Sequence, residues 1–231
     1  MEGFMSIRVE QREAETPLVR SIWRAHSEHD GYFMGKADSS WGLIVLKYKG
    51  LTHVSLIGPS THATSIPYRA GMDYLGICFQ LGTFMPHHLV GSVVDKTTPL
   101  PNATQHSFWL DDTPCPFPDY ENVEALVEKL VQKKLLVRDN LVEHVLVGED
   151  QPRTKRTVQR HFLCTTGLTL STIRQIERAR AAAELLERGV PILDVVHAAG
   201  YTDQPHLTNA LKRFIGQTPA QIAAEKHNMS L

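Results

Sequence analysis

The sequence is poor in cysteine and has no long apolar run. Its 231 residues include three cysteines, which lie far apart and form no Cys-x-x-Cys pair: Cys78, Cys115 and Cys164. This spacing argues against a disulfide framework or a structural zinc site and favours a reducing compartment. No apolar stretch approaches the roughly 20 residues of a membrane-spanning helix, and the polar N-terminus lacks the pattern of a signal peptide. We therefore expect a cytoplasmic protein with no membrane partner.

The sequence also lacks a strong net charge of either sign. Its 24 Lys and Arg residues nearly balance 25 Asp and Glu residues, which gives a net charge of −1. This balance is uneven along the chain, because residues 151–218 contain ten Lys or Arg and five Asp or Glu. That segment therefore carries +5 and the remainder carries −6. A locally basic module is typical of proteins that bind nucleic acid.

Short apolar runs between residues 16 and 110 predict β-strands. The run at 41–50 ends in a Lys-Gly turn and the run at 51–59 follows at once, as in a β-hairpin. Two further runs, at 74–82 and 106–110, are separated by proline-rich connections. Several strands without long helical patterns predict an antiparallel β-barrel or sandwich.

Helical periodicity replaces the strand pattern from Asp119 onward. Apolar residues recur at helical spacing within 120–136, and we expect Asp119 to cap this helix. Three prolines at 111–120 mark the boundary. The sequence therefore predicts an α+β fold with three parts: a β-rich domain at 1–118, a linker helix at 119–138 and an all-α domain at 139–231. It leaves open whether the linker helix packs on the β-domain or joins two subunits in a homodimer.

The all-α part contains an internal repeat with an offset of 49 residues. Apolar positions match apolar ones, Gly matches Gly and Thr matches Thr. The matched pairs are Val158 and Leu207, Phe162 and Leu211, Gly167 and Gly216, Thr169 and Thr218, and Ile173 and Ile222. A repeat of this size predicts one supersecondary unit that is used twice.

The second copy has the pattern of a helix-turn-helix. "PILDVVHAAG" predicts a short amphipathic helix that ends at Gly200, and either Thr202 or Asp203 can cap the next helix. An apolar stripe on that helix is expected to face inward: Leu207, Leu211 and Phe214. The polar side chains expected to face outward are Gln204, Thr208 and Asn209, followed by Lys212 and Arg213. Amides and hydroxyls at the start of a second helix suit base edges in the major groove. A solvated polar face is the simpler explanation for an isolated helix, but the repeat favours DNA binding.

The first copy, "TKRTVQRHF", is more basic than the second. We expect Thr154 to cap its helix, with Val158 and Phe162 facing inward. The outward-facing residues are then Arg156, Gln159 and Arg160, with Arg153 and Lys155 adding positive charge nearby. This surface suits guanine or phosphate contacts.

A long helix at 171–189 is predicted to connect the two copies. Its expected buried stripe consists of Ile173, Ile176, Ala179, Ala183 and Leu186. A helix of about 17 residues spans about 26 Å, which suits two helices that enter successive major grooves about 34 Å apart. Its arginines, Arg174, Arg178 and Arg180, either contact phosphates or pair with Glu177 and Glu184.

Residues 139–224 resemble the DNA-binding domain of the AraC/XylS family of bacterial transcription regulators. The resemblance is carried by "RTVQRHF…TTGLT…IRQIERARAAAELL" and by "ILDVVHAAGYTDQPHLTNALKRFIGQTPAQI". It implies two helix-turn-helix units joined by a long helix, with operator DNA as the partner, and RNA polymerase as a second partner in an activator. By position, the base-reading candidates are Arg156, Gln159, Arg160, Gln204, Pro205, His206, Thr208 and Asn209, and the remaining DNA-binding candidates are Lys155, Lys212 and Arg213.

The first unit departs from the family pattern in its turn. "DNLVEHVLVGEDQPRT" lacks the usual small residue there and brings Glu149 and Asp150 near the expected DNA side. We therefore expect a longer or altered turn in the first unit.

The resemblance implies an N-terminal β-barrel that senses a small molecule or mediates dimerisation. Aromatic residues that would line such a ligand site are Trp41, Tyr48, Phe79, Phe84 and Trp109, although aromatics on strands also serve as plain core. His53, His62, His87 and His88 lack the tight spacing of metal ligands, so we expect no metal and no cofactor. Two alternatives remain: a β-domain that serves only as an interaction module, and an enzyme whose barrel holds an active site and whose helical tail targets DNA. No Ser/His/Asp, Cys/His or carboxylate pair has a spacing typical of an active site, so we expect no enzyme activity.

Overall fold

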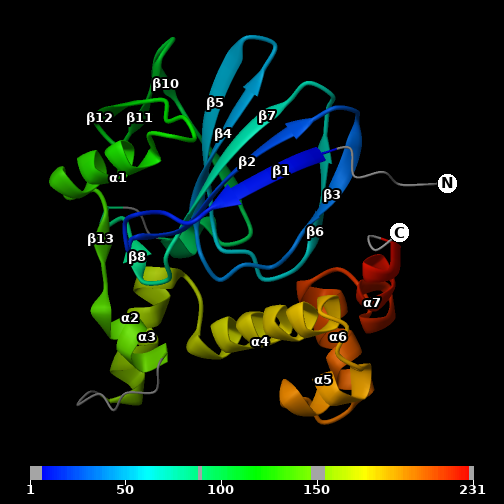
Figure 1. Ribbon diagram of the computed structural model, residues 1–231. Coiled ribbons are helices and arrows are strands. Elements are labelled where there is room, and N and C mark those ends of the chain that lie inside the picture. The colour runs from blue at the N-terminus through cyan, green and yellow to red at the C-terminus, as the bar shows by residue number, and fades with distance from the viewer. Residues whose placement is uncertain (1–6, 88–89, 147–153, 229–231) are drawn as a thin grey trace. The chain divides into compact units, whose positions relative to one another are not determined.

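The computed structural model describes residues 7–87, 90–146 and 154–228 (Figure 1). Its contacts divide the chain into two compact units. The first unit comprises Met1–Tyr32, Ser40–Pro59 and Pro67–Leu168. The second unit comprises Phe33–Ser39, Ser60–Ile66 and Thr169–Leu231. The first unit thus extends to Leu168, past the expected boundaries at 118 and 138, and two short N-terminal segments belong to the second unit.

A six-stranded antiparallel sheet dominates the first unit. Its strands, in spatial order, are β1 (Ile7–Arg12), β2 (Val19–Ser27), β7 (Asp73–Phe79), β4 (Gly42–Tyr48), β5 (Leu51–Ile57) and β9 (Thr97–Leu100). The predicted hairpin is confirmed, since β4 and β5 pair from Tyr48↔Leu51 onward. Its turn residues Lys49 and Gly50 have φ of 50° and 78°. Two left-handed residues match the right-handed twist of the strands, and Gly tolerates that conformation without strain.

Smaller elements complete the strand content of the described residues. These are β3 (Gly31–Gly35) paired with β6 (Thr64–Tyr68), β8 (Thr83–Phe84) paired with β13 (Val137–Arg138), and a three-stranded sheet of β10 (Asn102–Thr104), β11 (Ser107–Leu110) and β12 (Thr113–Pro116). A 3-10 helix, η1, spans Val90–Val93. The predicted antiparallel β-domain is thus confirmed.

Helix α1 (Val123–Gln132) packs into the core of the first unit. Its buried residues Val123, Leu126, Val127 and Leu130 join one cluster with sheet residues. The prediction that Asp119 caps this helix is wrong. Its carboxylate instead accepts hydrogen bonds from the amides of residues 121 and 122, at 3.0 Å each. Because these hydrogen bonds form a turn that precedes the helix, α1 starts later than expected.

A bidentate ion pair attaches β1 to the start of α1. Arg12 donates from Nη1 and Nη2 to the two carboxylate oxygens of Glu124, at 2.6 and 2.9 Å. The guanidinium lowers the pKa of Glu124 from 4.5 to about 2, because it stabilises the charged carboxylate. Both side chains are mostly shielded from solvent, so this pair contributes more than an exposed one.

The remaining helices lie in the C-terminal half. The first unit holds α2 (Asn140–Leu146) and α3 (Lys155–Thr166), and the second unit holds α4 (Leu170–Glu187), α5 (Ile192–Ala198), α6 (Gln204–Phe214) and α7 (Pro219–Asn228). The expected stripe of α4 is confirmed: Ile173, Ile176, Ala179, Ala183 and Leu186 are all buried, as is Ala182. No helix in the described ranges is long and apolar enough to cross a membrane.

The two N-terminal segments of the second unit hold the end of α6. The amide of Ala37 donates to the carbonyl of Phe214 at 2.7 Å, and that of Ala63 donates to the carbonyl of Arg213 at 2.8 Å. Carbonyls in the last turn of a helix have no partner within the helix. Segments 33–39 and 60–66 therefore satisfy backbone acceptors that the helix alone leaves open.

Candidate nucleic-acid interface

The predicted repeat appears in the structure as a repeated chain path. In each copy a helix is followed by a left-handed glycine, Gly167 with φ of 72° or Gly216 with φ of 85°. A threonine then caps the next helix. The hydroxyl of Thr169 accepts from the amide of residue 172 at 3.1 Å, and that of Thr218 accepts from the amide of residue 221 at 3.2 Å. Equivalent residues thus perform the same local task in both copies.

The second copy is a helix-turn-helix, as predicted. Helix α5 ends at Ala198, and Gly200 turns the chain with φ of 68°. Of the two expected caps of α6, Asp203 fills the role, because its carboxylate accepts from the amide of His206 at 2.7 Å. The inward stripe is buried, with Leu207 and Leu211 at 0% exposure and Phe214 at 3%. Pro205 fits the first turn, where its missing N–H costs no helical hydrogen bond.

The opposite side of α6 is polar and accessible. Exposed side chains there are Gln204, Pro205, His206, Asn209, Lys212 and Arg213, while Thr208 is half-buried. Gln204, Asn209 and Lys212 form no side-chain hydrogen bond or ion pair with other described residues. Arg213 stacks on Phe214, with its guanidinium carbon 4.9 Å from the ring centroid. The helix therefore presents unused donors and acceptors on the side away from its core.

Helix α3 of the first copy presents a more basic surface. Its expected cap is confirmed, since the hydroxyl of Thr154 accepts from the amide of Thr157 at 3.3 Å. Phe162 is fully buried, whereas Val158, expected to face inward, is only half-buried. The candidates Lys155, Arg156, Gln159 and Arg160 are all exposed. The altered turn with Glu149 and Asp150, and the neighbouring Arg153, lie outside the described residues.

Of the two roles expected for the arginines of α4, pairing with Glu177 or Glu184 does not occur. Arg178 stacks on the Tyr201 ring at 4.4 Å, and Arg180 forms an ion pair with Asp38 at 3.1 Å. Glu177 accepts from the hydroxyl of Ser39 at 2.5 Å. Partners distant in sequence replaced the nearby carboxylates, and only Arg174 stays exposed for a contact outside the chain.

The aromatic residues expected to line a ligand site occupy different environments. Trp41 and Phe79 stack at 4.2 Å in the core, where the indole N–H donates to the carbonyl of Thr83 at 2.6 Å. Tyr48 and Phe84 are half-buried, and Trp109 is 38% exposed. A void that Trp41 borders has a volume of about 10 Å³, which is enough for one water molecule.

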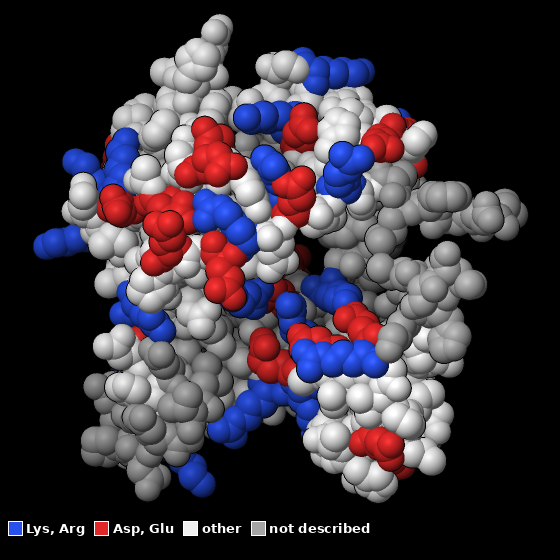
Figure 2. Space-filling view, in the orientation of Figure 1, with Lys and Arg blue, Asp and Glu red and all other residues white. Residues whose placement is uncertain are grey.

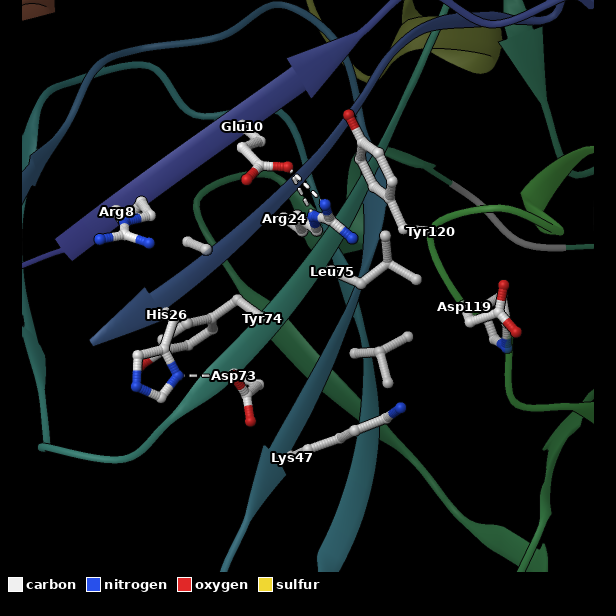
Figure 3. A pocket seen from close by; sticks show the side chains of 13 residues that line it. Arg8, Glu10, Arg24, His26, Lys47, Asp73, Tyr74, Leu75, Asp119 and Tyr120 are labelled. Atoms are coloured by element: carbon white, nitrogen blue, oxygen red, sulfur yellow. Dashed lines mark hydrogen bonds and ion pairs between the residues drawn. The ribbon is translucent and has the colours of Figure 1, made fainter. Parts of the chain in front are cut away.

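A larger groove of about 370 Å³ lies on the sheet and is lined by none of these five aromatics (Figure 3). It is lined by Arg8, Glu10, Arg24, Ala25, His26, Val45, Lys47, Asp73, Tyr74, Leu75, Pro118, Asp119 and Tyr120. An ion pair between Arg24 and Glu10, at 2.5 Å, and a contact between His26 Nδ1 and the carboxylate of Asp73, at 2.7 Å, lie along it. Arg24 also stacks on Tyr120 at 4.5 Å. The lining residues come from four strands and a loop, so no local motif could have predicted the groove.

Charges of both signs surround the groove. Figure 2 shows basic and acidic side chains intermixed over the sheet of the first unit. Lys47 forms no ion pair with the residues that the structure describes, whereas the neighbouring acidic groups Glu10 and Asp73 already have partners. In the described ranges, the groove included, no group of three His, Cys, Asp or Glu side chains comes together in a way that could hold a metal ion.

Comparison with known proteins assigns the C-terminal part. Residues 153–225 match a family model described as a helix-turn-helix domain. The HTH-type transcriptional regulator RipA of Corynebacterium diphtheriae is 36% identical over 73 residues, which cover 32% of this chain and 22% of that protein. RipA of Corynebacterium glutamicum is 38% identical over 82 residues, which cover 36% and 25%. The matches thus span about a quarter of the length of these curated relatives.

A solved structure of ToxT from Vibrio cholerae aligns with 95% of this chain and 98% of its own, at 10% identity and a TM-score of 0.40. The family match, by contrast, begins just before α3 and ends within α7, so it contains both copies of the repeat. Residues 153–225 therefore match a helix-turn-helix domain, the kind of domain that the repeat predicts.

Proposed function

We propose that the protein is a sequence-specific DNA-binding transcription regulator that acts in the cytoplasm and performs no covalent chemistry. The observation that carries this proposal is the polar side of α6. A helix held by three buried apolar residues exposes an amide, an imidazole and a second amide at Gln204, His206 and Asn209. In a helix-turn-helix the start of the second helix meets base edges, which these groups can read.

Helix α3 supplies the second contact in this proposal. Its Lys155, Arg156 and Arg160 are exposed and form no ion pair with another described residue. Free guanidinium and ammonium groups bind phosphates and guanine edges and release counterions from DNA. Basic residues near the end of α6, Lys212 and Arg213, extend the phosphate contacts of the second copy.

An electrophoretic mobility shift on a selected DNA site tests the proposal. We expect Gln204→Ala and Arg160→Ala each to weaken specific binding, and Gln204→Ala also to relax the base preference, because a bidentate side-chain contact discriminates by about 1–3 kcal/mol. Lys133→Ala removes an exposed charge from the end of α1 and serves as the control. If both test variants bind as the control does, these faces are not the DNA-binding surface.

We also propose that the groove binds a small-molecule effector. Its volume falls within the usual range for ligand sites, about 300–1,000 Å³. Leu75 and Val45 are apolar lining residues that are mostly buried. Tyr120 lies at one side (Figure 3), and the ammonium of Lys47 has no ion-pair partner among the described residues. This combination suits an organic acid with an apolar body, whose carboxylate pairs with Lys47.

Thermal unfolding with a panel of aliphatic and aromatic carboxylic acids tests the groove. An acid present at 100 times its Kd stabilises the folded state by about 2.7 kcal/mol. We expect Lys47→Met to abolish that shift and Lys49→Met, two residues along the chain, to retain it. If no acid in the panel shifts the native chain, or if Lys47→Met leaves the shift unchanged, the groove is not an acid-binding site. Control through dimerisation is then the alternative, which sedimentation at several protein concentrations detects.

A further inference from the structure

His206 differs from the other exposed polar side chains at the start of α6 because it is held in place. Its Nδ1 lies 2.8 Å from the hydroxyl oxygen of Thr202. Its ring meets the ring of Tyr201 edge to face, with centroids 5.0 Å apart and an interplanar angle of 89°. Gln204 and Asn209 have no such side-chain contacts with described residues. An exposed side chain that is already fixed loses less entropy when it binds.

The support beneath His206 is itself anchored. Tyr201 is only 5% exposed, and the Arg178 guanidinium covers its ring at 4.4 Å. Arg178 belongs to α4, and its Nη1 lies 3.5 Å from the carbonyl oxygen of Gly200. The long helix, the turn and the imidazole are thus connected in one series of contacts, within one unit. This series gives Arg178 a task other than the phosphate contact suggested by its sequence position.

The contact with Thr202 defines which ring nitrogen is available for DNA. The Thr202 hydroxyl donates no hydrogen bond to another described residue, so its proton can point to Nδ1. A neutral imidazole that accepts at Nδ1 carries its proton on Nε2. Nε2 has no hydrogen-bond partner in the part of the chain that the structure describes. In this tautomer the side chain presents one N–H donor to the outside.

Guanine offers the best partner for such a donor in the major groove. Its N7 and O6 are both acceptors, whereas adenine places an N6 donor beside N7. We propose that His206 donates from Nε2 to N7 of a guanine, and that Thr202 and Tyr201 are positioning residues that orient the imidazole for this contact. The inference rests on the proposed DNA binding and adds to it one base, one atom and two supporting side chains.

Replacement of single guanines by 7-deazaguanine tests the contact. The DNA site is first selected from random sequence with the full chain, and each guanine is then replaced in turn. At one position we expect the replacement to weaken wild-type binding by about 5- to 10-fold, the value of one hydrogen bond. His206→Ala should bind normal and replaced DNA equally at that position. A His206→Ala variant that keeps the wild-type sensitivity at every guanine would overturn the proposal.

The positioning role has its own variants. Thr202→Val keeps the shape but loses the hydroxyl, so we expect sensitivity to 7-deazaguanine to fall to about 2-fold or less. Thr202→Ser restores the hydroxyl and should restore the sensitivity. Lys133→Ala, which changes an exposed residue at the end of α1, serves as the control, with unchanged sensitivity. If Thr202→Val discriminates as well as the wild type, Thr202 does not orient the base contact.

Failure of this inference is distinguishable from failure of the proposed function. If the wild-type chain enriches no sequence from random DNA, sequence-specific binding itself is refuted. If it enriches a sequence in which no guanine is sensitive to 7-deaza replacement, the His206 contact is refuted while sequence-specific binding stands.

Discussion

The two copies of the repeat lie in different surroundings and expose different chemistry. Helix α3 belongs to the unit with the large sheet and displays Lys155, Arg156 and Arg160, whereas α6 belongs to the helical unit and begins with Gln204 and His206. Both begin with a capped residue, and α3 buries Phe162 where α6 buries three apolar residues. The shared caps and buried residues maintain the fold of the motif, and the different exposed residues give each copy a different role in DNA binding. The basic copy suits phosphate anchoring and the polar copy suits base discrimination.

The largest expected effect comes from the apolar side of the motif. Leu211 is fully buried, while Val158 in the first copy is only half-buried. Leu211→Ala should lower the free energy of unfolding of the second unit by about 2–5 kcal/mol, and Val158→Ala should lower that of the first by roughly 1 kcal/mol, because a shielded cavity costs more. Urea denaturation of the full chain measures both. Equal losses would show that the two copies are packed alike.

Acid should affect the first unit through Glu124. Because Arg12 lowers the pKa of Glu124 to about 2 from 4.5, the pair stabilises the folded state above about pH 4.5, and this contribution disappears as the pH falls toward 2. We expect the wild type to lose roughly 2 kcal/mol more than Glu124→Gln across that window. Denaturation at a series of pH values measures the difference. Glu10→Gln, which breaks an exposed pair with Arg24, is the control. Parallel pH profiles for wild type and Glu124→Gln would contradict the expectation.

Smaller effects should follow loss of the helix caps. Asp203→Ala and Thr154→Ala each remove an acceptor for an amide in the first turn, which costs about 1 kcal/mol. Conservative Asp203→Asn and Thr154→Ser changes should restore most of that stability. Thermal unfolding measures all four. A cap that proves neutral in one copy would mean that water or a neighbouring group already satisfies that amide.

The smallest expected effects are on the salt dependence of DNA binding, which should differ between α3 and α6 variants. Arg160→Ala removes a free cation and should reduce the slope of log K against log salt by about 1, whereas Gln204→Ala should leave the slope unchanged. Titrations of a labelled site at several salt concentrations provide the slopes. An unchanged slope for Arg160→Ala would remove α3 from the phosphate contacts.

Features encoded by neighbouring residues could be predicted from the sequence. The hairpin at Lys49 and Gly50, the cap at Thr154 and the buried stripe of α4 depend on residues within a few positions of one another. Features that depend on distant partners could not. Arg180 pairs with Asp38, and the amide of Ala63 donates to the end of α6. These partners are far apart in the sequence, so no local periodicity predicts them. The prediction that Asp119 caps α1 failed because the same carboxylate can either cap a helix or stabilise a turn before it.

Selection of binding sites from random DNA tests the central claim most directly, with the wild-type chain and Gln204→Ala compared side by side. We predict that the wild type enriches a sequence with two preferred segments about one helical turn apart, roughly 10 base pairs, and that Gln204→Ala loses preference in one segment while keeping it in the other. No enrichment by the wild type, or identical enrichment by both proteins, would contradict DNA reading by α6.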